Sequence, residues 1–446
     1  MNKSTDFIKG NIFKSILFFS LPLLVGNLFM QFYNTVDSYI VGNYVSAQAL
    51  AAVGQSTPIV NVIVGFFMGL STGAGVVVSQ FYGSEDQRRM SLAIHTAMAF
   101  SLVLCVIFTI LGLATCTPIL HFIKCPHDIM DMASLYLRIY FWGISFNLIY
   151  NMASGILRAV GDSKRPLYYL IVSSLVNIVL DFLFVLGFHL GVAGAAYATL
   201  IAQGVSCFLA LFHLMKTDEH YRLELRKLRF DVPTLTRIVK IGIPAALQIS
   251  IISFSNVYVM SYINAFGTTA VAGYSSYVKI DGFVIIPIQA FSMAVTTFTG
   301  QNYGARQFKR IRQGMYATIL MSTIVSTICV IIIYFFGRNL VGLFTNRQDV
   351  INYGYKMAQV FMLGYLIISI PNVMTGVLRG VGKSFVPMIV LIFCYVILRQ
   401  IYLAIVTKIS SSIAVVYAGW PITWVICAII LMIYYKLVFK LPEELD

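Results

Sequence analysis

The sequence predicts an all-α integral membrane protein of about 12 transmembrane helices, built as two parallel six-helix repeats with both termini in the cytoplasm. Three features predict this fold: the composition, the spacing of apolar segments and an internal repeat. Of the 446 residues, 59% are hydrophobic and only 11% are charged, whereas a soluble domain carries roughly 25% charge. The mean hydropathy of +0.84 agrees. Such a chain cannot cover a water-facing surface.

Apolar segments long enough to cross a bilayer, which takes about 20 residues each, divide evenly between the two halves of the chain. They are expected at 14–42, 47–80, 91–114, 131–157, 166–187, 191–215, 236–264, 268–302, 313–337, 350–378, 384–407 and 410–435. Each half therefore holds an even number of spans. Both halves then start on the same side of the membrane, and the repeat axis runs along the membrane normal.

The internal repeat is visible in recurring motifs. L-R-A-V-G-D-S-K-R-P at Leu157–Pro166 returns as L-R-G-V-G-K-S-F-V-P at Leu378–Pro387, an offset of 221 residues (378 − 157). Further matched positions are Gln80 and Gln301 at the same offset, and Pro22 with Pro244 and Asn34 with Asn256 at an offset of 222. Two copies of one unit explain these matches, and a repeat has to be recognised before a fold is assigned.

The orientation follows from the basic residues. The N-terminus, alternate loops and the C-terminus hold 23 of the 31 Lys and Arg residues. The intervening loops hold only Lys124, Arg338, Arg347 and Lys408. Because cytoplasmic loops carry an excess of positive charge, we expect both termini inside. The expected organisation is an N-lobe at 1–215, a cytoplasmic linker at 216–235 and a C-lobe at 236–446.

The same charge pattern limits the classes of function. The net charge of +14 comes from loops between apolar segments, so no nucleic-acid partner is expected. The Cys and His residues between Cys116 and His127 match no standard zinc spacing, and the six histidines are scattered. We therefore expect neither a metal site nor an enzyme.

Three carboxylates lie deep in apolar segments: Asp37, Asp181 and Asp281. Because burying an ionisable group in the membrane is costly, such groups are candidate functional sites. Asp37 and Asp181 both fall roughly 8–9 Å inside the outer ends of their helices. Asn177 lies one turn from Asp181, and Thr199 lies about 12 Å along its own helix from the outer end. These four oxygen-bearing side chains predict a site for a hard cation or a proton.

The third carboxylate, Asp281, is expected to be structural. Lys279 is two residues away on the same helix, so the two side chains do not face each other. Arg399, on the eleventh span, is the better partner. The sequence therefore predicts a structural cluster of buried charge formed by Lys279, Asp281 and Arg399, in which Asp281 and Arg399 pair.

With these residues located, the chain resembles a multidrug and toxic compound extrusion (MATE) transporter over essentially its whole length. The resemblance rests on the two six-helix halves, on S-L-P at Ser20–Pro22, on G-Q-N-Y-G at Gly300–Gly304 and on the paired L-R-x-V-G-x-S motifs. Members export bulky, often cationic and lipophilic compounds, driven by inward flow of H⁺ or Na⁺. The resemblance implies a secondary active cation/drug antiporter that works by alternating access and needs no cofactor besides the coupling ion.

The pattern of N-lobe residues is similar to the prokaryotic DinF-like branch, which is related to DNA-damage-inducible protein F. There, helix 1 carries an Asp, helix 5 an Asn-x-x-x-Asp and helix 6 a Thr, matched here by Asp37, Asn177, Asp181 and Thr199. The resemblance also implies a substrate cavity that includes Tyr33, Asn34 and Asn151. The acids that Na⁺-coupled members carry on helices 7 and 10 are missing, apart from Asp349 at the mouth of helix 10.

Further expectations concern motion, partners and location. Pro22 gives helix 1 a place to bend. The resemblance implies small-molecule drugs or toxic metabolites as substrates, contact with membrane lipids, a monomer, and a multi-pass protein of the prokaryotic plasma (inner) membrane.

Other classes of membrane protein remain as alternatives. A lipid or polysaccharide-precursor flippase of the same superfamily would usually have more basic residues along its cavity and often extra helices. A channel would need neither broken helices nor a titratable pair. The sequence leaves open the native substrate and the choice between H⁺ and Na⁺.

Overall fold

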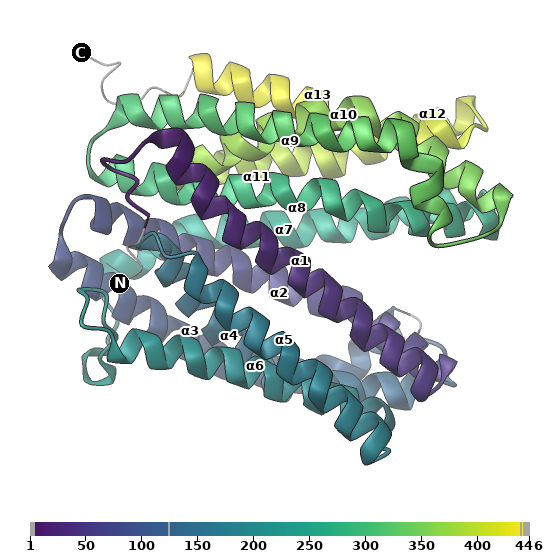
Figure 1. The fold of residues 1–446 in the computed structure, drawn as a ribbon, viewed down its shortest axis with the longest axis horizontal. Helices are drawn as coiled ribbons and strands as arrows, with labels where there is room; N and C mark the ends of the chain where they lie inside the picture. The colour runs from purple at the N-terminus through teal and green to yellow at the C-terminus, as the bar shows by residue number, and fades with distance from the viewer. Residues whose placement is uncertain (1–4, 124, 438, 440–446) are drawn as a thin grey trace. The chain divides into compact units, whose positions relative to one another are not determined.

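The computed structural model describes residues 5–123, 125–437 and 439, and these residues form helices joined by short connections (Figure 1). The predicted lobe ends at 1–4 and 440–446, together with the loop residue Lys124, lie outside the described residues. No strand occurs in the described part of the chain.

The first repeat contains six membrane-length helices. They are α1 (Ile12–Tyr44), α2 (Ala47–Gly83), α3 (Gln87–Phe122), α4 (Met130–Ala159), α5 (Lys164–Asp181), which continues as the π-helix η1 (Phe182–Gly187), and α6 (Gly191–Lys216). Several helices extend beyond the predicted apolar segments, and polar residues cap the starts of two of them. The Ser46 hydroxyl accepts from the Ala49 backbone N–H at the start of α2, and the Asp86 carboxylate accepts from the Arg89 backbone N–H at the start of α3.

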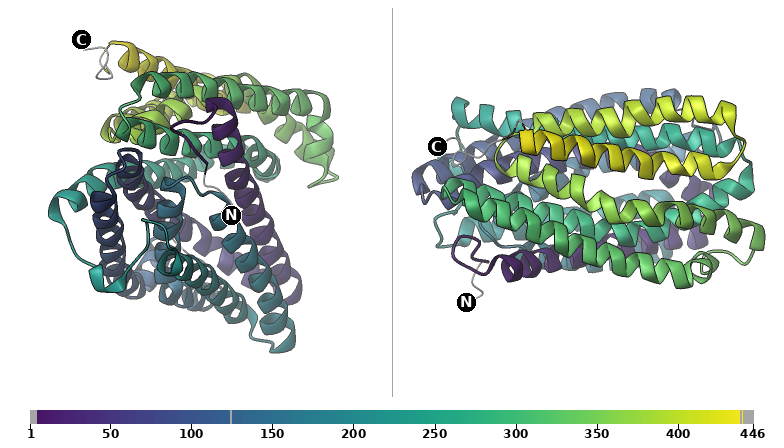
Figure 2. Two further views of the ribbon diagram at one scale, coloured as in Figure 1. Left: turned by 60° about the vertical axis from the view of Figure 1, so that its left-hand side comes forward. Right: turned by 90° about the horizontal axis from the view of Figure 1, so that it is seen from above.

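The second repeat has the same order of elements. It contains α7 (Val232–Asn264), α8 (Thr268–Gly304), α9 (Phe308–Gly342), α10 (Gln348–Gly380), one span made of α11 (Phe385–Ile392), the π-helix η3 (Phe393–Leu398) and α12 (Arg399–Ile409), and then α13 (Ile413–Leu437). Within this half, α10 packs against α8, α9 and α13 (Figure 2). Among the described residues, eleven spans are apolar and long enough to cross a membrane, and α4, of 30 residues, is a twelfth helix of membrane length. The predicted all-α membrane fold of two six-helix repeats is confirmed.

Matching backbone details show how closely the two repeats agree. Gly161 and Gly382, in the paired L-R-x-V-G motifs, have φ angles of 89° and 90°, a left-handed conformation that favours glycine. The Ser71 hydroxyl donates to the Asn151 carbonyl, and the Ser292 hydroxyl donates to the Asn372 carbonyl. The first bond joins α2 to α4, and the second joins α8 to α10. In each bond the two residues are 80 positions apart in the sequence.

The chain forms two compact units whose limits differ from the simple halves of the sequence. One unit contains 21–246, and the other contains 6–20 with the described residues of 247–446. The start of α7 thus belongs to the first unit, where a Cβ on Gly73 would lie 2.5 Å from the Cα of Gly242. Residues 6–20 belong to the second unit, although Thr5 is assigned to the first, and the Arg310 guanidinium donates to the carbonyls of Phe7 and Gly10 at 2.9 and 2.8 Å.

The predicted linker, 216–235, is held against α3 of the first unit. The backbone N–H of Glu224 donates to His95 Nε2 at 3.0 Å, and that of Asp231 donates to Thr96 Oγ1 at 3.3 Å. The Asp231 carboxylate accepts from the Thr234 N–H and caps the start of α7. These hydrogen bonds from Thr234 hold the pKa of Asp231 below its usual range.

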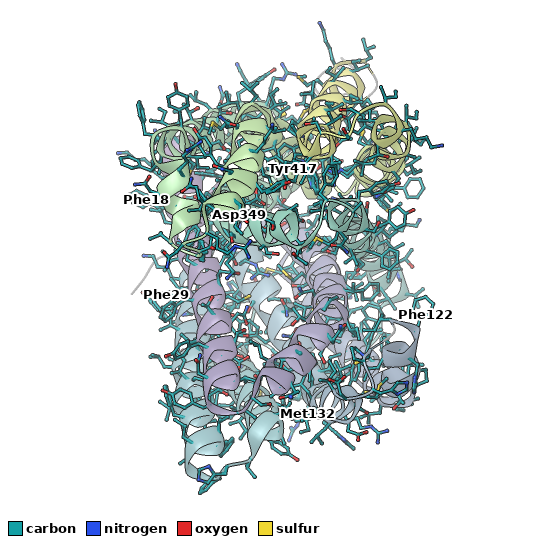
Figure 3. The ribbon with its side chains drawn as sticks, turned by 90° about the vertical axis from the view of Figure 1, so that its right-hand side faces the viewer. Phe18, Phe29, Phe122, Met132, Asp349 and Tyr417 are labelled. Carbon is teal, nitrogen blue, oxygen red and sulfur yellow. The ribbon has the colours of Figure 1, made fainter. Side chains whose placement is uncertain are left out.

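Large apolar side chains cover the outer surfaces of the helices, as a protein dissolved in lipid requires. Phe122 at the end of α3 is 82% exposed and is labelled in Figure 3. Leu363 on α10 and Phe335 on α9 are also exposed.

The predicted orientation can be tested with single cysteines at two exposed positions, Asn43 at the end of α1 and Arg226 in the linker. The basic loops predict that an impermeant thiol reagent on intact cells labels position 43 and spares position 226. The seven native cysteines are buried or half-buried, so background labelling should be low. Labelling of 226 but not of 43 would reverse the topology.

Candidate cation site

Four helices of the first unit each present a pair of polar side chains one turn apart. The pairs are Tyr33 and Asp37 on α1, Tyr136 and Tyr140 on α4, Asn177 and Asp181 on α5, and Thr199 and Gln203 on α6. Residues four apart lie on the same face of a helix, and α6 packs against both α4 and α5. We refer to these eight residues as the four-helix polar cluster.

The carboxylates of the polar cluster are buried without protein partners. Asp181 is 0% exposed and Asp37 is 9% exposed. Neither carboxylate oxygen of Asp181 has a hydrogen-bond partner among the described residues, and neither does Oδ1 of Asp37. Since buried polar groups are nearly always hydrogen-bonded, this arrangement is costly for folding and points to a binding role.

The amide of Asn177 extends the same feature. Asn177 is 1% exposed, and within the described chain neither its Oδ1 nor its Nδ2 has a hydrogen-bond partner. Thr199 is 8% exposed, and its hydroxyl oxygen, like the carboxylate and amide oxygens, is a ligand atom for a hard cation. The residues predicted for the cation site are therefore buried side chains of α1, α5 and α6, which supply several oxygen atoms and no positive charge.

The two carboxylates interact electrostatically with each other, which places them in one environment. Arg138 on α4 is exposed and donates to the Thr117 hydroxyl at 3.4 Å. It is not in ion-pair contact with either carboxylate in the described structure. Two buried carboxylates within electrostatic range disfavour each other's charged form, and a bound cation or a proton relieves that repulsion.

Two tyrosines of α4 were not predicted as site residues. Tyr136 interacts electrostatically with Asp37 and Asp181, and Tyr33 interacts with both carboxylates and with Tyr140. The Tyr140 hydroxyl is hydrogen-bonded to Gln203. The sequence signal for these residues was a spacing of four between two tyrosines in an apolar run. The same spacing is equally common on a helix face that only packs against its neighbours.

The π-helix η1 begins immediately after Asp181. π-turns inside α-helices are rare and are frequent at functional sites. The α-helical hydrogen-bond pattern of α5 therefore ends at Asp181, which bears the buried carboxylate, and the wider turn of the π-helix follows.

The structure gives the surroundings of two predicted cavity residues, and their place in a substrate cavity stays a prediction. The Asn34 side chain is exposed. The Asn151 amide donates to the carbonyl and side-chain oxygens of Asn147, both at 2.9 Å. Asn151 lies eleven residues after Tyr140, or about 16 Å along α4, and its carbonyl takes part in the hydrogen bond that both repeats share. Its contacts are those of a scaffold residue.

Pro22 lies inside α1, which continues on both sides of it. Proline has no N–H to donate to the carbonyl four residues earlier, so one helical hydrogen bond is missing there. The boundary between the two compact units falls at 20/21. The role of Pro22 as a bend remains a prediction.

The predicted ion pair in the second unit is wrong. The Tyr365 hydroxyl donates to Asp281 Oδ1. Arg399 donates instead to Asn256 Oδ1 at 3.1 Å and to Thr423 Oγ1 at 3.2 Å. Among the described residues, Asp281 and Arg399 form no ion pair with each other. Neutral hydroxyl and amide groups have replaced the expected charged partners.

The prediction that Lys279 is buried is also wrong. Its side chain is exposed, and its ammonium lies 4.9 Å from the centre of the Phe344 ring. Residues two apart in a helix point in nearly opposite directions, so Lys279 faces outward where Asp281 faces Tyr365.

Comparison with known proteins agrees with this organisation. The MatE family model matches residues 22–183 and 244–406, so it matches each repeat once and begins at Pro22 and at Pro244. Together the two matches cover more than half of the chain. The protein belongs to the MatE family.

Curated relatives and solved structures extend over nearly the whole chain. The probable multidrug resistance protein YpnP of Bacillus subtilis is 30% identical over 409 residues, 90% of each chain. The multidrug export protein MepA of Staphylococcus aureus is 24% identical over 378 residues, 85% of this chain and 84% of MepA. An outward-facing multidrug resistance MATE family transporter superposes with a TM-score of 0.92 at 24% identity, covering 98% of each chain. The chain is a multi-pass protein of the cell membrane.

Replacing Asp181 with Asn should show that the carboxylate is held at a cost to stability. The substitution Asp181→Asn keeps the shape and removes a buried charge without a protein partner. We expect a higher Tm in detergent at pH 8, equivalent to about 1–3 kcal/mol.

The matched control is Asp281→Asn, which removes the carboxylate that accepts from Tyr365 and should give no gain. If Asp181→Asn lowers the Tm as much as the control does, the Asp181 carboxylate is a structural group.

Proposed function

We propose that the protein is a secondary active multidrug efflux transporter that exchanges an inward-moving cation, H⁺ or Na⁺, for a lipophilic cationic compound. The observation that carries the proposal is the pair of buried carboxylates, Asp37 and Asp181, with no basic partner among the described residues. The family and the names of the relatives, multidrug resistance and multidrug export proteins, support the substrate class.

The coupling ion would be shared by the polar cluster. A proton or Na⁺ between Asp37 and Asp181 removes the repulsion between two negative charges in a low-dielectric site. Oxygen atoms of Asn177 and Thr199 and the phenols of α4 complete the surroundings. Binding would change the contacts among α1, α5 and α6. It drives transport only because the ion binds the two conformations with different affinity.

Substrate exchange follows from the same charges. A cationic drug is attracted to the deprotonated cluster, and aromatic ring faces add roughly 0.5–2 kcal/mol. Neutralisation of the carboxylates by the incoming ion removes that attraction, so the drug is released outward. Pro22 supplies α1 with a point at which to bend during this step.

A lipid or polysaccharide-precursor flippase is the second candidate. Such a substrate carries phosphate, which requires basic groups in the cavity. The buried site of the first unit has carboxylates and phenols, so antiport of a cationic compound fits better.

Neutralising either carboxylate should abolish coupling. In vesicles with the proton and sodium gradients imposed separately, we expect Asp37→Asn and Asp181→Asn each to lose gradient-driven efflux of a cationic dye. Folding and weak dye binding should persist, because an amide keeps the size of the side chain.

The matched control is Asp349→Asn at the exposed start of α10 (Figure 3), where Asp349 pairs with Arg347 at 2.6 Å. It should export the dye as the wild type does. Normal gradient dependence in Asp37→Asn would refute the first-unit site.

The substrate class can be tested in cells. Expression in a drug-sensitive host should raise resistance to lipophilic cationic dyes and amine drugs more than to neutral or anionic compounds, since only cations are attracted to Asp37 and Asp181. If sensitivity to the whole panel is unchanged while the protein is present in the membrane, the flippase is the better assignment.

A further inference from the structure

We propose that the second unit contains a binding site for a small monovalent anion at the guanidinium of Arg399. This residue begins α12, directly after the π-helix η3, and lies in the middle of the span Phe385–Ile409. It is 2% exposed, so the charge is buried at membrane depth. The site is separate from the carboxylates of the first unit, and the proposal does not depend on which cation drives transport.

The hydrogen bonds of Arg399 leave its charge uncompensated. Both side-chain acceptors are neutral: Asn256 Oδ1 at 3.1 Å and Thr423 Oγ1 at 3.2 Å. The Nε–H group has no hydrogen-bond partner among the described residues. A buried guanidinium without a counter-charge is strongly unfavourable, so a donor is left available for a negative ligand.

Aromatic rings provide part of the stabilisation. The guanidinium carbon lies 5.4 Å from the centre of the Tyr395 ring and 5.2 Å from that of Trp420. Ring faces attract a cation but supply no negative charge. They define two sides of the site and leave its net charge positive.

The acidic residues of the second unit are engaged elsewhere. In its described residues they are Asp6, Asp281 and Asp349, and the Asp6 carboxylate accepts from the backbone N–H groups of Ile8 and Lys9. Asp281 accepts from the Tyr365 hydroxyl, and Asp349 pairs with Arg347 at the exposed start of α10. In the described structure neither forms an ion pair with Arg399.

A second donor lies in the same cluster. Tyr417 on α13, labelled in Figure 3, is 0% exposed, and its hydroxyl has no hydrogen-bond partner in the described residues. Tyr417 lies one turn before Trp420, whose ring centre is 5.2 Å from the Arg399 guanidinium carbon, and residues three apart share a face of a helix. A guanidinium N–H and a phenol O–H are donors, and donors are what an anion requires.

The repeat relates this site to the polar cluster of the first unit. Pro166 and Pro387 are 221 positions apart at the start of the fifth and eleventh spans. The π-helix η3 then accommodates one extra residue per turn, after which the offset becomes 222 and Arg399 matches Asn177 (399 − 222). The first unit has an amide beside carboxylates at this position, and the second has a cation beside phenols. The two sites therefore have opposite charge preference.

The charge of the site limits the ligand. One guanidinium balances one negative charge, and the donors without a partner are the Arg399 Nε–H and the hydroxyls of Tyr395 and Tyr417. A halide ion or the carboxylate group of an organic anion can accept from these donors. A divalent anion such as sulfate would leave a surplus negative charge buried.

Halide binding can be followed through tryptophan emission, because iodide quenches indole on contact and Trp420 adjoins Arg399. The three tryptophans are Trp142, Trp420 and Trp424, so Trp142→Phe restricts the signal to α13. Sodium iodide is titrated into the purified full-length protein at constant ionic strength, with sodium sulfate as the balancing salt. We expect saturable quenching. If acetate displaces iodide, the site also binds carboxylates. If acetate does not compete with iodide, the site binds halides alone.

Variants link the signal to the site. Arg399→Gln should weaken iodide binding about tenfold or more, because the charged hydrogen bond is lost, and Arg399→Lys should retain part of the affinity. Asp281→Asn is the control and should bind iodide at least as tightly as the wild type.

If Arg399→Gln does not fold, Tyr417→Phe tests the anion site instead, because this substitution removes only a hydroxyl. It should raise the half-saturating iodide concentration several-fold. Linear, unsaturable quenching that is the same in the wild type and in Tyr417→Phe would overturn the proposal.

Discussion

A charged side chain inside a membrane bundle has to be neutralised, and this requirement organises both units of the protein. Each unit buries ionisable groups that the chain itself leaves incompletely paired. In the first unit they are the carboxylates of Asp37 and Asp181, with neutral amide and phenol neighbours. In the second, Arg399 has neutral acceptors and ring faces. Since lipid supplies no counter-ions, a ligand, or for the carboxylates a proton, would neutralise these groups.

The scaffold around these groups is made rigid by repeated contacts and close helix packing. The bond from Ser71 to the Asn151 carbonyl recurs as the bond from Ser292 to the Asn372 carbonyl. On Gly69 a Cβ would lie 2.3 Å from the backbone of Ala246, so α2 and α7 approach closely where small residues permit it. Such contacts hold polar side chains on neighbouring helices at fixed positions. Packing of this kind can offset the cost of burying carboxylates without protein partners.

Much of the fold was predictable from the sequence because hydropathy and repeated motifs can be read from the chain without knowing which residues are in contact. Hydropathy marks the spans, and matched motifs such as those at Leu157 and Leu378 reveal the repeat. Asp37 and Asp181 could be selected because carboxylates are rare in apolar segments. Partners were not predictable: Tyr365 is as plausible a neighbour of Asp281 as Arg399 until the rotation of each helix is known. For the same reason, the outward direction of Lys279 and the place of Tyr136 beside Asp37 were missed. The start of α7 belongs to the first unit and residues 6–20 belong to the second. This division depends on tertiary packing, which leaves no local signal in the sequence.

The π-helix η3 carries a consequence for how two copies of one unit can diverge. Each residue added to an α-helix would turn everything after it by about 100°, but a π-turn takes up the added residue and leaves the following residues on their original faces. Both repeats have such a turn in the same span, after Asp181 in the first copy and before Arg399 in the second. A position beyond the turn therefore keeps the direction of its twin. Substitution at one position, an amide at Asn177 and a guanidinium at Arg399, is then enough to reverse the charge that a span presents.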